Sequence, residues 1–325
     1  MSPAERTNAL DALARALGGL AERDVALGPL TTYRVGGPAA LFVEARSVAD
    51  LSSVRAALAA APAPVLVVGK GSNLLVADAG FPGLAVRLAP ADPSEFTGFS
   101  LRSLESAGPD ARLVRAGAAL GLPVLARRAV EAGARGLEWA VGVPGSVGGA
   151  IRMNAGGHGA DVAAGLARYG WMDLGSDAGG EDGVDRLAPS YRSTSIGPTE
   201  VVLWAEFAAT AGPVDEGRAE IAEIVRWRRA NQPGGSNAGS VFTNPPGSSA
   251  GALVDRAGLK GLRVGSACVS TKHANFIQAD EGGSADDVWR LIGRVRAAVE
   301  ESSGVRLGTE VRLVGFDRDP SEVRA

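Results

Sequence analysis

A glycine-rich run at residues 142–159, GVPGSVGGAIRMNAGGHG, constrains the fold of this chain more than any other feature. Seven of its eighteen residues are glycine, so it offers few side chains for a core. Backbone without Cβ atoms can approach a ligand closely, and consecutive N–H groups form concave sites for anions. A second glycine loop, GKGSN at 69–73, follows the apolar stretch 64–68. The two loops are either tight turns or the binding site of a cofactor that carries two linked phosphates.

Neither glycine loop has the spacing of the common nucleotide-binding motifs. The pattern G-x-G-x-x-G is missing from both loops, and G-x-x-x-x-G-K-[ST] is missing from the chain. These spacings are what the Rossmann fold and the P-loop require. The residues therefore favour a dinucleotide cofactor bound in a different kind of fold.

Composition excludes several classes of function. With 325 residues the chain is long enough for two or three domains. The net charge of −3 argues against binding to nucleic acid or to an anionic membrane surface. No apolar run is long enough to span a membrane, and residues 1–24 lack the pattern of a signal peptide, so we expect a cytoplasmic protein. We also expect no obligatory protein partner.

The cysteine and histidine content limits redox and metal chemistry. Cys268 is the single cysteine of the chain, which excludes an intrachain disulfide and a CxxC pair. The two histidines, His158 and His273, do not form an HExxH motif. We therefore expect no metal site.

Hydrophobic periodicity and capping residues divide the chain into helices and strands. We predict helices over 1–24, after Ser47, over 122–133, over 213–233, near 249–257 and after Ser284. We predict strands at 64–68, 83–88, 111–117, 166–174, 200–210, 263–270, 273–279 and 305–316. These elements suggest three domains, at 1–88, 89–210 and 211–325.

Seven motifs then carry a family resemblance. In chain order they are TTYRVGG, VVGKGSNLLV, GLEWAVGVPGSVGGAIRMNAGGHG, YRSTSI, NAGSVFTNP, KHANFIQA and GTEVRLVGF. From about Thr31 to Phe316 the chain resembles the UDP-N-acetylenolpyruvoylglucosamine reductase (MurB) family. Too few residues separate YRSTSI from NAGSVFTNP for the tyrosine-bearing lid loop of the longer class, so the chain is similar to the shorter class.

This resemblance implies a fold, cofactors and a reaction. The fold is α+β: a two-subdomain FAD-binding fold of the vanillyl-alcohol-oxidase (PCMH) type, followed by a C-terminal α+β substrate domain. The implied reaction uses NADPH to reduce the enolpyruvyl group of a nucleotide sugar, UDP-N-acetylglucosamine enolpyruvate, to UDP-N-acetylmuramate for peptidoglycan. The implied FAD contacts are Tyr33, Gly69, Lys70, Gly71, Ser72, Asn73, Gly142, Val143, Pro144, Gly145, Ser146, Gly148, Gly149, Ile151 and Asn154. The implied substrate contacts are Tyr191, Asn244 and His273.

Three residues match the catalytic positions of the family. The reaction delivers hydride from reduced flavin to the terminal carbon and then a proton to the carbon that bears the carboxylate. The resemblance implies that Arg192 and Glu310 stabilise the enolate and that Ser240 donates the proton. From the residues alone, Arg192 is more typical of a surface side chain and Ser240 of a turn or cap. Glu310 is likewise more typical of a solvated strand face, paired with Arg306 or Arg312.

The chain departs from the family pattern at the expected diphosphate contacts. Asn231 and Thr243 stand where many members have lysine, and Ile196 stands where phenylalanine is usual. Arg228 or Arg229 could supply the missing charge. Two other functions share some of these features: an oxidase of a sugar lactone or hydroxyacid on the same FAD fold, and a nucleotide-sugar-binding protein without redox activity.

Overall fold

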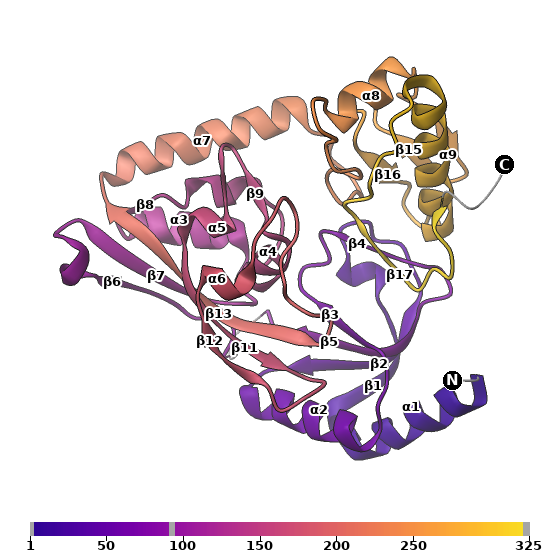
Figure 1. The fold of residues 1–325 in the computed structure, drawn as a ribbon, viewed down its shortest axis with the longest axis horizontal. Helices are drawn as coiled ribbons and strands as arrows, with labels where there is room; N and C mark the ends of the chain where they lie inside the picture. The colour runs from indigo at the N-terminus through magenta and orange to yellow at the C-terminus, as the bar shows by residue number, and fades with distance from the viewer. Residues whose placement is uncertain (1–2, 91–94, 321–325) are drawn as a thin grey trace. The chain divides into compact units, whose positions relative to one another are not determined.

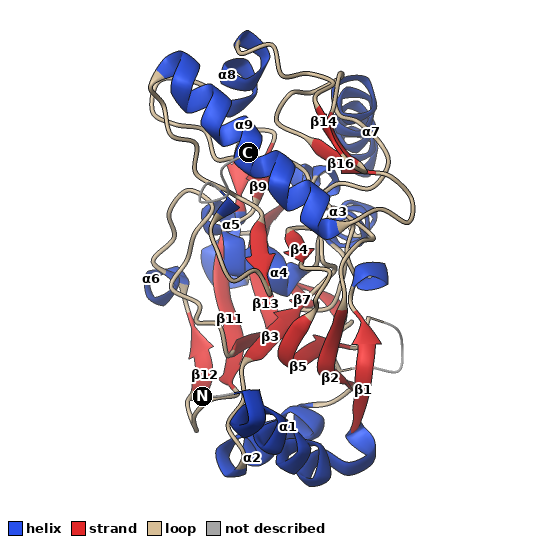
Figure 2. Ribbon diagram, turned by 90° about the vertical axis from the view of Figure 1, so that its right-hand side faces the viewer, coloured by secondary structure: helices blue, strands red, loops and turns tan. Residues whose placement is uncertain are grey.

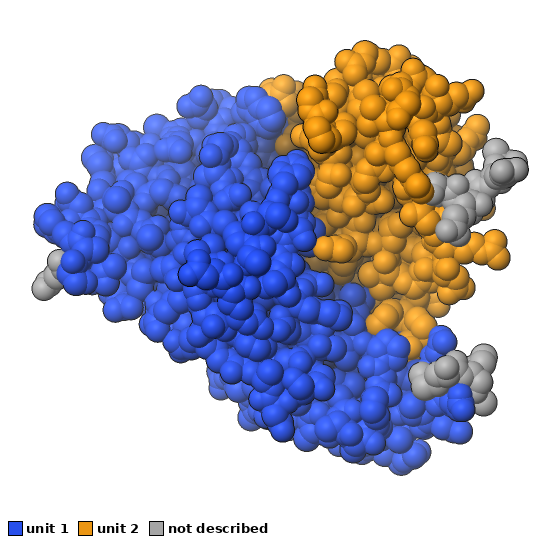
Figure 3. All heavy atoms as spheres, in the orientation of Figure 1, with its two compact units in different colours: residues 1–23, 41–70, 83–228 blue, residues 24–40, 71–82, 229–325 orange. Residues whose placement is uncertain are grey.

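The chain forms two compact units, each assembled from three separate stretches (Figure 3). The computed structural model describes residues 3–90 and 95–320. Unit 1 contains 1–23, 41–70 and 83–228, and unit 2 contains 24–40, 71–82 and 229–325.

The helix predicted over 1–24 is shorter than expected, because it ends at Leu17 and a strand begins at Ala21, whereas the helix predicted after Ser47 is present. Helix α1 (Pro3–Leu17) buries Leu10, Leu13 and Leu17 and packs against α2 (Val48–Ala60), as Figure 2 shows. The hydroxyl of Ser47 accepts a hydrogen bond from the N–H of Asp50, and the Asp50 carboxylate accepts one from the N–H of Ser47. This reciprocal pair is a capping box, which satisfies the first N–H groups of α2.

A four-stranded sheet leads into the first glycine loop. Its strands, in spatial order, are β1 (Ala21–Ala26), β2 (Pro38–Ala45), β5 (Phe81–Leu88) and β3 (Val65–Val68). Strand β3 runs parallel to β5, with Val65 beside Leu84, and ends directly before the GKGSN loop. The strand predictions at 64–68 and 83–88 are therefore confirmed.

The larger sheet belongs to unit 1 and has six strands. Its main path is β12 (Gly179–Asp182), β11 (Leu166–Asp173), β13 (Glu200–Ala211), β7 (Ala111–Gly117) and β6 (Phe99–Ser103), and β8 (Ala134–Arg135) pairs with the end of β13. Helices α3 (Leu122–Glu131), α4 (Val147–Met153) and α5 (Val162–Gly165) lie on one face of it (Figure 1). Between the helices and the sheet lies a core that includes Tyr169 and Phe207.

The remaining elements of unit 1 surround the second glycine run. The short strands β9 (Gly156–Gly157) and β10 (Ala160–Asp161) pair within and just after the run. Helix α6 (Val184–Leu187) precedes the YRSTSI segment. Helix α7 (Val214–Asn231) begins with Asp215 and Glu216 in its first turn, as the dipole of a helix favours.

Unit 2 is built around α9 (Ala285–Ser303). Ser284 caps this helix, and one face of it is buried, formed by Val288, Leu291, Ile292, Val295 and Val299. The helix packs against β14 (Arg263–Val264), β15 (Ala267–Val269) and β16 (Ile277–Ala279), while α8 (Ala250–Arg256) contacts it as well. Strand β4 (Leu74–Val76) runs parallel to β17 (Arg312–Val314).

Three predicted strands of unit 2 differ from the prediction. The stretch 263–270 forms the two strands β14 and β15, which pair with each other antiparallel. The stretch 273–279 is a strand from Ile277 onward, because the N–H of Phe276 bonds back to the carbonyl of His273 at 3.0 Å and closes a turn. The stretch 305–316 is a strand from Arg312 onward. Before that point, the N–H of Glu310 donates to the carbonyl of Val241 at 2.8 Å, so this backbone follows the Ser240 segment rather than a sheet.

Candidate active site

The two glycine loops meet within unit 1. A Cβ atom placed on Gly69 would lie 2.7 Å from Oγ of Ser146, and one placed on Gly121 would lie 3.1 Å from Cε of Lys70. The same Ser146 hydroxyl accepts a hydrogen bond from the N–H of Gly149 at 3.3 Å. A side chain at Gly69 would therefore displace the cap of α4, and glycine is required here by close packing between the loops.

The second loop presents backbone donors. The carbonyl of Gly145 accepts from the N–H of Leu122, and the N–H of Val147 donates to the carbonyl of Leu120, both at 2.9 Å. Within the described part of the chain, the N–H groups of Gly145 and Ser146 donate to no acceptor. Adjacent N–H groups of this kind form a concave site for an anion, and a diphosphate fits that donor set.

The rest of the GKGSN loop belongs to unit 2 and lies against the TTYRVGG segment. The N–H of Thr32 donates to the carbonyl of Gly71 at 3.2 Å. Tyr33 is fully buried beside this contact, and burial raises the pKa of its hydroxyl, which therefore stays protonated. Among the described residues, the buried hydroxyl oxygens of Thr32 and Tyr33 have no hydrogen-bond partner. Buried polar atoms are normally satisfied, so these two fit a site that receives a polar ligand.

The segment with Tyr191 and Arg192 is attached to the second glycine run. The guanidinium of Arg192 donates to the carbonyl of Gly156 at 2.9 Å. The side-chain amide of Asn154 donates to the carbonyl of Ser190 at 3.2 Å, and the hydroxyl of Thr194 donates to the carbonyl of Arg152 at 2.8 Å. Three hydrogen bonds between the segment and the run thus anchor the segment at Ser190, Arg192 and Thr194.

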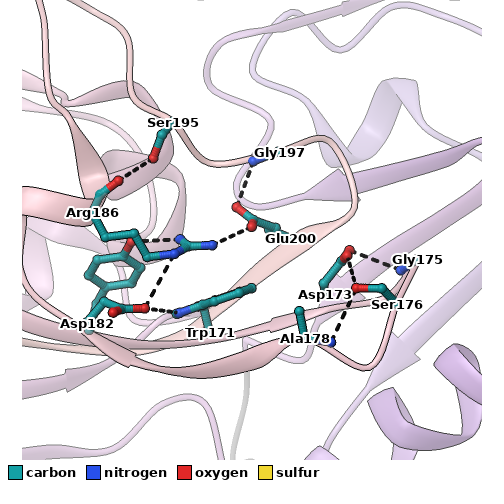
Figure 4. Close-up of polar contacts among 11 residues, drawn as sticks. Trp171, Asp173, Gly175, Ser176, Ala178, Asp182, Arg186, Ser195, Gly197 and Glu200 are labelled. Carbon is teal, nitrogen blue, oxygen red and sulfur yellow. Dashed lines mark hydrogen bonds and ion pairs between the residues drawn. The ribbon is translucent and has the colours of Figure 1, made fainter.

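The far end of this segment is held by Arg186 (Figure 4). Its guanidinium donates to the hydroxyl of Tyr169 at 3.0 Å and to Glu200 at 2.6 Å, and it lies 3.5 Å from the ring centre of Trp171. The hydroxyl of Ser195 in turn donates to the backbone carbonyl of Arg186 at 2.6 Å. The segment that carries Arg192 is therefore tied to the sheet of unit 1 as well as to the glycine run.

Tyr191 is one of the few large hydrophobic side chains that are exposed in the described chain, with 58% of its surface accessible. The guanidinium carbon of Arg192 lies 5.1 Å from its ring centre. A cation at this distance from a ring is within range of a cation–π interaction. The ring of Tyr191 and the guanidinium of Arg192 therefore lie next to each other in unit 1.

In unit 2 the structure brings Ser240 and Glu310 onto adjacent backbone segments. The carbonyl of Val241, the residue after Ser240, accepts from the N–H of Glu310. The side-chain amide of Asn73 donates to the carbonyl of Glu310 at 3.1 Å, and the carbonyl of Asn73 accepts from the N–H of Arg312 at 2.9 Å. The GKGSN loop, the Ser240 segment and the Glu310 segment thus form one connected set of hydrogen bonds.

Other residues from the sequence analysis have contacts of their own. Ile151 is fully buried in the core of unit 1, and the Asn154 side chain also bonds Asp161 and the N–H of Ala163. The side-chain oxygen of Asn244 accepts from the N–H of Ala250, the first residue of α8, at 3.0 Å. Their roles toward a cofactor or substrate stay predictions.

His273 lies in a tight turn of unit 2. Its Nδ1 accepts a hydrogen bond from the N–H of Asn275 at 3.3 Å, and its ring meets Phe276 edge to face, with 4.7 Å between the ring centres. Burial, together with the nearby charge of Lys260, lowers the pKa of His273 below its usual 6.5. The neutral ring is therefore the form that this turn requires.

The lowered pKa of His273 predicts a loss of stability in acid. The unfolded chain takes up the proton near pH 6.5, whereas the folded chain takes it up only at lower pH. The free energy of unfolding should therefore fall as the pH drops below about 6.5 and level off below the folded pKa. Urea unfolding of the wild type and His273→Gln at pH 7.5 and pH 5.0 checks this. The glutamine variant should lose less stability than the wild type; equal losses would contradict the assignment.

None of the helices in the described ranges is long and apolar enough to cross a membrane. No group of three or more histidine, cysteine or acidic side chains in those ranges is arranged to hold a metal ion.

Comparison with known proteins gives the family. A family model described as an FAD binding domain matches residues 39–168, and one described as the C-terminal domain of UDP-N-acetylenolpyruvoylglucosamine reductase matches 231–314. UDP-N-acetylenolpyruvoylglucosamine reductase 2 of Symbiobacterium thermophilum is 41% identical over 88% of this chain and 90% of its own length. The reductase of Rubrobacter xylanophilus is 39% identical over 91% and 95%.

A solved structure agrees in fold with these sequence relatives. The crystal structure of the reductase (MurB) from Thermus caldophilus superposes with a TM-score of 0.73 and 36% identity, over 90% of this chain and 98% of that one. The expected fold class, an FAD-binding fold followed by a MurB-type C-terminal domain, is therefore confirmed. Two family models match residues 39–168 and 231–314, and the two relatives align over 88% and 91% of the chain. The chain therefore belongs to the UDP-N-acetylenolpyruvoylglucosamine reductase family.

Proposed function

We propose that this protein uses NADPH to reduce UDP-N-acetylglucosamine enolpyruvate to UDP-N-acetylmuramate, with FAD as its cofactor, in the synthesis of peptidoglycan precursors. Family membership supports the reaction. The observation that carries the proposal further is the set of hydrogen bonds that joins Asn73 of the glycine loop to Glu310, and Glu310 to the segment of Ser240. It connects a predicted cofactor loop to two predicted catalytic residues within one unit.

The glycine loops fit FAD. The N–H groups of Gly145 and Ser146 suit its diphosphate, and the hydroxyls of Thr32 and Tyr33 are buried donors that still need a partner. When bound, FAD supplies the hydride-transfer chemistry that links NADPH to the enolpyruvyl group. Because both the reductant and the nucleotide sugar need access to it, we expect the two to bind in alternation.

The protein side chains have three tasks in this proposal. Arg192 offers two parallel N–H donors to the substrate carboxylate, where negative charge develops. Glu310 supports that enolate or positions the substrate. Ser240 donates its hydroxyl proton to the carbon beside the carboxylate, which completes the addition of one hydride and one proton across the double bond.

The proposal extends to the compartment of the reaction. We place it in the cytoplasm, in agreement with the single cysteine of the chain, Cys268, which is not paired in a disulfide.

One experiment tests the function directly. The purified protein should be yellow, lose its colour with NADPH in the absence of oxygen, and regain it when UDP-N-acetylglucosamine enolpyruvate is added. Colour that returns with oxygen but not with the enolpyruvyl sugar would instead indicate an oxidase of a sugar lactone or hydroxyacid. Protein that carries no flavin would indicate a binding protein.

Gly71→Ala should weaken flavin binding. Gly71 has a φ of +60°, and a Cβ atom there would lie 2.3 Å from the carbonyl oxygen of Leu30, so alanine would force the loop away from the TTYRVGG segment. We expect the free energy of unfolding to fall by about 1–3 kcal/mol, together with a lower ratio of flavin to protein. Gly98→Ala is the control, because a Cβ atom on Gly98 would meet nothing within 4 Å. Full flavin content in Gly71→Ala would contradict the role of this loop.

A further inference from the structure

A buried asparagine, Asn275, holds the backbone that follows Ser240. The carbonyl of Asn275 accepts from the N–H of Val241 at 2.8 Å. Its side-chain oxygen accepts from the N–H of Phe242 at 3.0 Å, and its side-chain nitrogen donates to the carbonyl of Phe242 at 2.8 Å. Only 4% of the Asn275 surface is exposed. Three hydrogen bonds therefore fix two consecutive residues directly after the proposed proton donor.

The contact between the Asn275 side chain and the backbone of Phe242 requires a group that both accepts and donates a hydrogen bond, as a carboxamide does. A neutral amide side chain can accept and donate at once, whereas an ionised carboxylate only accepts and a methyl group does neither. In a buried position, each backbone group left without its partner is costly. Asn275 is thus suited to satisfying both polar groups of Phe242 in a stretch that forms no strand.

The neighbouring contacts leave Ser240 at a defined point. Val241 is held on both sides, because its N–H bonds Asn275 and its carbonyl bonds the N–H of Glu310. Before Ser240, Gly239 has a φ of +76°, and its N–H donates to the side chain of Asn237 at 3.0 Å. The position of Ser240 is consequently set by a glycine turn on one side and by the Asn275 contacts on the other.

Asn275 is itself held by the turn that contains His273. The hydroxyl of Ser270 accepts from the N–H groups of Lys272 and His273, and the N–H of Ser270 donates to the carbonyl of Phe276 at 2.8 Å. The N–H of Asn275 donates to His273 Nδ1. This turn lies in the KHANFIQA motif, so the sequence contains the residue but gives no sign of its contact with Val241 and Phe242.

We propose that Asn275 is a positioning residue for proton transfer: its backbone and carboxamide fix Val241 and Phe242 so that the Ser240 hydroxyl is held at the carbon it protonates. A serine hydroxyl is a weak acid, so its proton transfer depends strongly on geometry. The proposal rests on the proposed role of Ser240. Asn275 does not contact the substrate and acts through Ser240 alone.

A double-mutant cycle tests this inference. Asn275→Asp keeps the size of the side chain and its acceptor but removes the donor to the Phe242 carbonyl. Reoxidation of the reduced flavin by UDP-N-acetylglucosamine enolpyruvate should slow by about 10- to 100-fold, while reduction by NADPH stays near normal. In a Ser240→Ala background the same change should have less than about a twofold effect, because the group that Asn275 positions is already gone.

The control separates positioning from general loss of stability. Val299→Ala removes a buried side chain from the core of unit 2 and should lower Tm without changing the ratio of the two half-reactions. Where Asn275→Asp gives no flavin-loaded protein, Asn275→Ser replaces it in the cycle. Equal slowing of both half-reactions, or the same factor with and without Ser240, would overturn the inference. If Ser240→Ala alone fails to slow reoxidation selectively, the proposed role of Ser240 is wrong instead.

Discussion

Replacing Ser240 with alanine should leave the reduction of the flavin by NADPH near its normal rate while slowing reoxidation by the enolpyruvyl sugar by about 10²- to 10⁴-fold. Only the second half-reaction needs a proton on the carbon of the substrate. Alanine keeps the backbone bonds of the segment, because the contacts of Val241 and Phe242 with Asn275 and Glu310 do not use the Ser240 side chain. The effect should therefore fall on chemistry rather than on folding.

Stopped-flow absorbance of the flavin measures both half-reactions of Ser240→Ala separately. Ser302→Ala is a suitable control, because the Ser302 hydroxyl bonds the backbone carbonyls of Ala298 and Val299 within α9. It should leave both rates unchanged. If Ser240→Ala slowed the two half-reactions by the same factor, the hydroxyl would not be the proton donor.

Arg192→Lys is the second change for which we expect a large effect. Lysine retains the positive charge but offers a single ammonium in place of two parallel N–H groups, so the enolate loses its bidentate partner. Loss of one stabilising donor at a developing negative charge typically slows a reaction by about 10²- to 10³-fold. Reoxidation by the nucleotide sugar should slow by that factor, and reduction by NADPH should change little.

The Arg192 segment should stay in place in this variant. Its contacts through Asn154, Thr194 and Ser195 do not involve the guanidinium of Arg192. Arg127→Lys is the matched control, because Arg127 also donates to a backbone carbonyl in unit 1, that of Pro123, on an exposed helix surface. Melting temperatures of both variants should match the wild type. A normal reoxidation rate in Arg192→Lys would remove Arg192 from the proposed mechanism.

Local signals in the sequence predicted much of the secondary structure. Ser47 and Ser284 cap helices as expected, because an N-cap depends only on the residues that follow it. The buried stripe of α9 follows from helical spacing alone. The family follows from the order of seven motifs, and the comparisons confirm it.

Contacts between distant parts of the chain were not predictable in the same way. The sequence predicts a long strand over 305–316, yet only Arg312–Val314 forms one. The reason is tertiary: Glu310 bonds Val241, and Arg312 bonds Asn73, so the competing partners lie elsewhere in the chain. The contacts of Asn275 are not predictable for a similar reason, since an asparagine in a motif does not indicate which backbone it bonds. Periodicity describes one face of one element and contains no information on such partners.

The assembly of unit 2 from three separate stretches has a consequence for synthesis of the protein. Asn73 bonds Glu310, which is 237 positions later in the chain, and β4 pairs in parallel with β17 near the end of the chain. During synthesis, Asn73 and β4 therefore leave the ribosome long before Glu310 and β17 are made. A chain that ends before Arg312 contains the sequence of unit 1 in full and still leaves the apolar β4 unpaired, an edge that favours aggregation. Incomplete translation products are thus expected to aggregate rather than to fold as partial enzymes.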